Sequence, residues 1–318
     1  MDFESGFALR PVNPLNGPTY RQSPATSNPL GPLANLAGIW KGTGFNTIWR
    51  PNQVGQAGQP ANQDRFLELN VTSETLTFTP IPGEITNRGL LQPDIQMFGL
   101  TYLQQISDAI LNTGIHVEPG IWATVPVTTN PAEVSTVVRM ASIPHGTTMN
   151  AQGVAVTVNG GPNIAPVSIT PFVIGDPTKL VPFPESDLAI PTPFRSPQPP
   201  QLSEISQGMV DDPNSILTAA TKGQNITETI ALIISTEVAA PLTGSGTDNT
   251  SFLQGGTAGP NALGAKVTAI FWIETVAVPH QPSFLQLQYT QTVLLNFNGL
   301  SWPHVSVATL RHHLAHIV

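Results

Sequence analysis

Four of the seven histidines of this chain lie within its last fifteen residues: His304, His312, His313 and His316. Imidazole is a common protein ligand for transition metals and for haem iron. If the last dozen residues form one short helix, as we expect, His312 and His316 share a face and could hold a metal ion together. No carboxylate lies nearby in the sequence to complete such a site. A solvated helix end, where the dipole favours cationic histidine, is the simpler interpretation.

His304 differs from the other three because Pro303 directly precedes it. Proline fixes its own φ angle and has no backbone donor, so the backbone that presents this imidazole is stiffened. Two interpretations stay open. His304 is either a ligand held at the rim of a β-structure or an ordinary exposed histidine after a final strand.

Another group of residues that can carry chemistry lies near the middle of the chain. His116 and Glu118 are two positions apart, so they share one face if the segment is extended. His116 could line a pocket and exchange a proton there, or it could bond a loop carbonyl. His145 lies in a Pro-His-Gly turn, where we expect exposure to solvent. Arg139 suits a carboxylate partner, which could be a ligand or Glu118, or it could face solvent.

Six large apolar side chains could line a ligand cavity, although residues of these types more often pack in the core. They are Trp40, Trp49, Trp122, Trp272, Met140 and Met149.

Familiar catalytic signatures are missing from the sequence. It contains no Gly-x-Ser-x-Gly motif, no phosphate-binding loop, no His-Glu-x-x-His motif and no cysteine. Catalysis would therefore have to come from a bound cofactor, with the protein supplying a ligand and a pocket.

The composition limits which fold classes and which kinds of partner are compatible with this chain. Charged residues make up only 10 % of the chain, while Pro and Gly are abundant, which favours short strands and turns over helices. The net charge of −8 and the lack of basic runs argue against nucleic-acid binding. We find no signal peptide and no apolar run of membrane-spanning length, so we expect a cytoplasmic protein without membrane contact.

Hydrophobic periodicity predicts an all-β fold. Residues 284–297 alternate clearly, with Leu287 and Tyr289 on one face and Gln286 and Gln288 on the other. In residues 65–81 we expect two strands joined by a turn at Glu74. Residues 1–34 read as an extended N-terminal arm, and residues 35–318 as one domain. Eight to ten strands leave a sandwich or a closed barrel.

Blocks of sequence, in order, resemble the nitrobindin family, the haem-binding branch of the fatty-acid-binding-protein-like (calycin) barrels. The blocks are residues 38–44 (GIWKGTG), 102–104 with 114–120 (YLQ and GIHVEPG), 137–153 (VVRMASIPHGTTMNAQG) and 287–310, the last of which contains Pro303-His304 and ends at Leu310. This resemblance implies an antiparallel barrel of about ten strands, enlarged here by insertions around residues 155–225 and 239–264.

The same resemblance implies haem b as the cofactor, with His304 as the ligand of its iron and His116 as the best candidate on the opposite, distal side. Trp40, Trp122, Arg139 and Met140 would then contact the haem, Arg139 through a propionate. Nitric oxide, peroxynitrite or peroxide would be the small-molecule partner, with a peroxidase-like or peroxynitrite-isomerase-like activity.

Two alternatives remain at this stage. The same barrel could carry a fatty acid or another apolar molecule in place of haem. The chain could also be a structural protein that self-associates into a homo-oligomer, because a surface with so little charge permits association.

Overall fold

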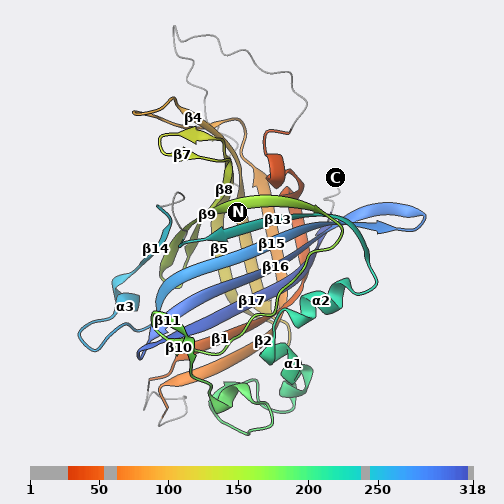
Figure 1. The fold of residues 1–318 in the computed structure, drawn as a ribbon. Helices are drawn as coiled ribbons and strands as arrows, with labels where there is room; N and C mark the ends of the chain where they lie inside the picture. Colours follow the sequence, from red (N-terminus) through yellow and green to blue (C-terminus); the bar gives the residue numbers. More distant parts are fainter. Residues whose placement is uncertain (1–27, 54–62, 238–243, 314–318) are drawn as a thin grey trace.

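Ten long antiparallel strands form a closed barrel in the computed structural model of the chain (Figure 1). The structure describes residues 28–53, 63–237 and 244–313. The barrel strands, in spatial order, are β1 (Gly38–Pro51), β2 (Arg65–Pro80), β4 (Ile95–Asp108), β5 (Thr113–Val125), β8 (Thr136–Ile143), β9 (Thr147–Asn159), β13 (Asn225–Ser235), β15 (Leu263–Val278), β16 (Gln281–Phe297) and β17 (Leu300–His313). Pairing of β17 with β1 closes the ring, so the all-β antiparallel barrel expected from the sequence is confirmed.

Shorter strands and helices lie before the barrel strands and in the connections between them. They are β3 (Ile85–Asn87), β6 (Thr128–Thr129), β7 (Ala132–Glu133), β10 (Phe172–Val173), β11 (Asp176–Leu180), β12 (Arg195–Ser196), β14 (Gly246–Asn249), the 3-10 helices η1 (Gly31–Leu36), η2 (Pro184–Ser186) and η3 (Gln201–Glu204), and the α-helices α1 (Gln207–Asp211), α2 (Ser215–Thr221) and α3 (Ser251–Gln254). None of the described helices is long and apolar enough to cross a membrane.

The inside of the barrel is an apolar core over much of its length. Every barrel strand contributes an inward side chain to this core, with Trp40, Trp122 and Phe271 among the largest. The end of the expected N-terminal arm forms η1, which places Leu33 and Leu36 in the same core. Residues 1–27 of that arm lie outside the described residues.

A separate core lies on the outer face of the barrel. Residues 160–224, which join β9 to β13, cross this face and pack Ile169, Val210 and Leu217 against outward side chains such as Val305 and Val307. Figure 1 shows α1 and α2 of this connection beside the barrel wall. The alternation expected in residues 284–297 is therefore confirmed, although the outward Gln286 and Gln288 are buried beneath the connection.

Two local predictions are wrong. The expected C-terminal helix is not formed in its described part, because β17 continues to His313 and pairs with β16 up to Arg311 and with β1 up to His313. Ala308 and Leu310 point into the core while Val307 points outward, so alternation along the closing strand prevails over local helical propensity. Likewise, β2 runs without a turn through Glu74, which faces inward between Thr72 and Leu76.

Candidate functional site

Three histidines from distant parts of the sequence gather at one end of the barrel, which we call the histidine end. His304 lies near the start of β17, His116 near the start of β5, and His145 in the turn between β8 and β9. Because Ser306 and Ala308 face inward, His304, two residues earlier, faces inward as well. The rings of His116 and His145 lie 5.7 Å apart.

Asn46 of β1 fixes the protonation state of His304. The Nε2 atom of His304 lies 2.8 Å from Asn46 Oδ1, which also accepts a hydrogen bond from Ser306 Oγ at 2.8 Å. Because an amide oxygen only accepts, the proton of the neutral ring must be on Nε2, and the lone pair must be on Nδ1. Burial, together with the nearby charges of His116 and His145, lowers the pKa of His304 to about 3. The ring is therefore a neutral imidazole at physiological pH, which is the form that coordinates metals.

His116 is oriented by the acid that the sequence places two residues away. Its Nε2 lies 3.4 Å from Glu118 Oε2, and a carboxylate can only accept, so Nε2 carries a proton. The side chain of His116 is 13 % exposed, whereas Glu118 is fully buried. Burial and the charge of His116 lower the pKa of His145, which is the most exposed ring of the three.

A buried ion pair lies next to the histidines in the barrel interior. Arg139 Nη2 donates to Glu118 Oε1 at 2.6 Å, Nε donates to the hydroxyl of Tyr102 at 2.9 Å, and Nη1 donates to Gln291 at 2.7 Å. Burial alone would raise the pKa of Glu118, but the charge of Arg139 and the bonds from His116 and Tyr102 lower it to about 2. The pairing of Arg139 with Glu118 is one of the alternatives that the sequence left open.

Gly120 makes room for this network. A Cβ atom at Gly120 would lie 2.5 Å from the ring of Tyr102, whose hydroxyl donates to Glu118. The presence of glycine after the His-x-Glu pattern therefore has a steric explanation, since any side chain at position 120 would displace Tyr102.

A second buried carboxylate, Glu74, was missed by sequence reasoning, which placed a turn at this residue. Tyr289 donates a hydrogen bond to Glu74 Oε1, and Gln104 Nε2 donates to the same oxygen at 3.1 Å. Oε2 has no hydrogen-bond partner among the described residues. Burial raises the pKa of Glu74 to about 7. The only available signal was its inward place in the alternation of β2.

Other predicted site residues are not brought together with His304. Trp40 lies in the apolar core, donating its indole N–H to Leu36 at 2.7 Å and packing its ring against His312 at 4.8 Å. Because Trp40 lies six residues from Asn46 along β1, roughly 20 Å separates it from the histidine end. Trp122 packs edge-on against Phe271 in the same core. The prediction that these tryptophans contact a haem is not tested by these positions.

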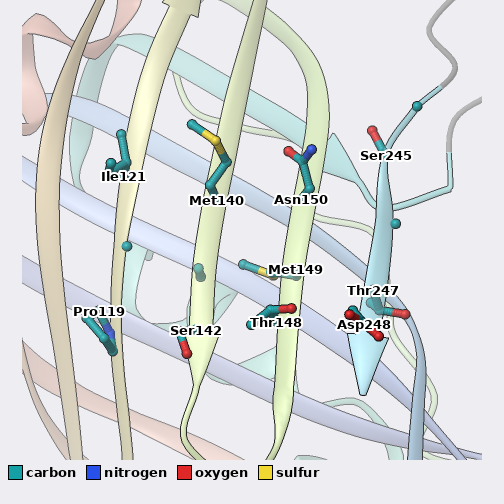
Figure 2. A pocket seen from close by; sticks show the side chains of 14 residues that line it. Pro119, Ile121, Met140, Ser142, Thr148, Met149, Asn150, Ser245, Thr247 and Asp248 are labelled. Atoms are coloured by element: carbon teal, nitrogen blue, oxygen red, sulfur yellow. The ribbon is translucent and has the colours of Figure 1, made fainter. Parts of the chain in front are cut away.

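Met140 points away from the barrel interior. It follows the inward Arg139 on β8 and, with Ile121 and Asn150, lines an outer groove of about 840 Å³ whose other wall is residues 244–248 (Figure 2). Met149 packs inside with Val267 and Val293, while Trp49 and Trp272 lie in the outer core.

The helix on which a metal pair of His312 and His316 would depend is not formed in the described residues. His312 is part of a strand, and its Nε2 lies 2.9 Å from the carbonyl of Ala37. His316 lies outside the described residues. No group of three or more His, Asp or Glu side chains within residues 28–53, 63–237 and 244–313 is arranged to hold a bare metal ion.

Comparison with known proteins yields little similarity. No protein-family model matches the chain, and no curated protein matches it. Among solved structures, the chain is similar to the crystal structure of Rv2717c from M. tuberculosis, at 12 % sequence identity and a TM-score of 0.40, over 91 % of this chain and 99 % of that one. The fold described above therefore rests on the strand pairing of this chain.

Proposed function

We propose that the barrel binds haem b at its histidine end, with Nδ1 of His304 as the axial ligand of the iron. The observation that carries this proposal is the state of His304, which is neutral, has its tautomer fixed by Asn46 and keeps one lone pair free. A porphyrin supplies its own equatorial ligands, so one imidazole from the protein is sufficient. The resemblance of the sequence blocks, in their order, to the nitrobindin family also implies His304 as the ligand of the iron.

The other residues of the histidine end have roles that follow from their bonds. Asn46 accepts from His304 and so keeps the ring in one orientation, as partners of metal-bound histidines do. Glu118 orients His116 through its Nε2, so Nδ1 on the other side of the ring is the atom that can take or give a proton in the same space. Bound haem would supply the iron chemistry toward nitric oxide, peroxynitrite or peroxide that the family resemblance implies.

The interior favours haem at this end over a fatty acid along the barrel axis. Trp40, Trp122 and Phe271 are buried in the core beyond the histidine end and fill the space that a long acyl chain would need. A ligand is therefore expected at the histidine end and not along the whole axis.

Titration of the purified apoprotein with hemin tests the proposal. The parent protein should give a sharp Soret band with saturable binding, and His304→Ala should lose or shift it. His313→Ala is the matched control, because His313 is exposed on the same strand and should not change the spectrum. Added imidazole should restore a parent-like spectrum to His304→Ala. A colourless parent protein, or a band unchanged by His304→Ala, would reject His304 as the ligand.

Asn46→Leu sharpens this test. Removing the acceptor should weaken hemin binding by about tenfold or more, since such supporting partners contribute roughly 10- to 100-fold to metal affinity. Far-UV circular dichroism shows whether the barrel is intact in this variant. An unchanged affinity and spectrum would mean that Asn46 does not support the ligand.

A further inference from the structure

The connection between β9 and β13 leaves an open cleft on the outside of the barrel. Residues 163–167 and Asn214 form one wall, and outward residues of β9, β13, β15 and β16 form the floor, around a cavity of about 550 Å³. Volumes of this size are typical of small-molecule sites. The cleft is separate from the histidine end, because its floor is the opposite face of the strands.

The described lining of this cleft is neutral. It contains no Asp, Glu, Lys, Arg or His, and its floor presents apolar side chains such as Val154, Ile233 and Ile270 beside the hydroxyls of Thr268 and Thr292. An ion would lose its hydration there without gaining a counter-charge, so the cleft disfavours charged molecules.

One hydrogen-bond donor among the residues that line the cleft bonds no other described residue. Trp272 lines the cleft and is only 5 % exposed, and its indole N–H donates to no acceptor among the described residues. By contrast, the indoles of Trp49 and Trp302 in the same outer core donate to backbone carbonyls at 2.9 Å. The indole N–H of Trp272 is therefore available to an acceptor that a ligand brings.

We propose that this cleft binds a small, uncharged and largely apolar molecule that carries a carbonyl or ether oxygen, which accepts a hydrogen bond from Trp272. Val154, Ile233 and Ile270 contact the apolar body of the molecule, and the wall at residues 163–167 covers it. This site does not depend on haem.

Prodan, an uncharged naphthyl ketone whose emission shifts with the polarity of its surroundings, is a suitable probe. Titration of the apoprotein should show saturable binding with emission shifted to the blue. Trp272→Phe keeps the aromatic ring but removes the N–H, and it should weaken binding by about three- to tenfold, the effect of one hydrogen bond.

Ile233→Trp gives a second variant that does not disturb the core, because Ile233 is 42 % exposed. Its larger side chain should fill the cleft and abolish binding. Ser142→Trp, in the other outer groove, is the matched control and should bind prodan like the parent. Absence of binding, parent-like affinity in Ile233→Trp or in Trp272→Phe, or loss of binding in His304→Ala would each overturn the proposal.

Discussion

Two carboxylates inside the same barrel are buried almost equally but differ in charge. Glu118 is 0 % exposed and Glu74 is 3 % exposed. Glu118 faces the guanidinium of Arg139, and its pKa is lowered to about 2, whereas Glu74 has only the neutral donors Tyr289 and Gln104, and its pKa is raised to about 7. Burial alone raises the pKa of a carboxyl, so the difference arises because a cation touches one and not the other.

The comparison also distinguishes two regions of the barrel interior by how their charge responds to pH. The region around Glu118 is a fixed ion pair that orients His116 at any pH near neutrality. The region around Glu74 changes charge near neutral pH, so its contribution to stability depends on pH.

Arg139→Met should have the largest effect. The variant leaves Glu118 buried without its cation, and removing one partner of a buried ion pair costs about 3–5 kcal/mol. Urea unfolding at pH 8 measures this loss. The deficit should shrink toward pH 5, because Glu118 without Arg139 acquires a raised pKa and becomes protonated in the folded state.

The double variant Arg139→Met with Glu118→Gln is the control for that experiment. It removes both charges and should recover part of the lost stability. A deficit below about 1 kcal/mol in the single variant would mean that His116 or solvent compensates Glu118, and that the ion pair does not set its charge.

Glu74→Gln should remove a pH dependence of about 3 kcal/mol. The pKa of Glu74 is about 7 in the folded protein against 4.5 for the ordinary group, and each pKa unit corresponds to about 1.4 kcal/mol. The protonated form therefore stabilises the parent fully below pH 4.5, and this contribution is lost as the pH rises through 7. Unfolding free energies of parent and variant, compared from pH 4.5 to 8, should diverge with the variant more stable at the higher pH.

Glu274 provides a check on the same measurement. It is buried on the outer face beside Gln286, and burial also raises its pKa to about 7. Glu74→Gln should therefore leave a residual loss of stability with rising pH that becomes smaller in the double variant with Glu274→Gln. Parallel curves for parent and Glu74→Gln would show that Glu74 is ionised throughout this range.

Tyr289→Phe should have the smallest effect, about 1 kcal/mol for one hydrogen bond. Tyr289 donates to Glu74, and this bond favours the ionised carboxyl, so the loss should be larger at pH 8 than at pH 5. Thermal or urea unfolding at the two pH values measures it. In the Glu74→Gln background the effect should not vary with pH, and a variation there would point to another titrating group.

The sequence by itself determined which residues of β16 face inward. Alternation assigned Leu287 and Tyr289 to one face of a strand and Gln286 and Gln288 to the other, and the structure confirms this assignment. The abundance of Pro and Gly with few charges indicated an all-β fold, because strand propensity and turn chemistry are encoded locally.

Only the tertiary structure decided which inward residues meet. His304 bonds Asn46 across 258 positions of the sequence, and Tyr289 bonds Glu74 across 215, because β17 closes the barrel against β1 and a ring of strands brings distant residues inside. The same closure turned the expected C-terminal helix into a strand, since pairing on two sides and burial on both faces outweigh the helical propensity of a short segment. Local sequence sets the face of each residue, while its partners, and hence its charge, follow from how the barrel closes.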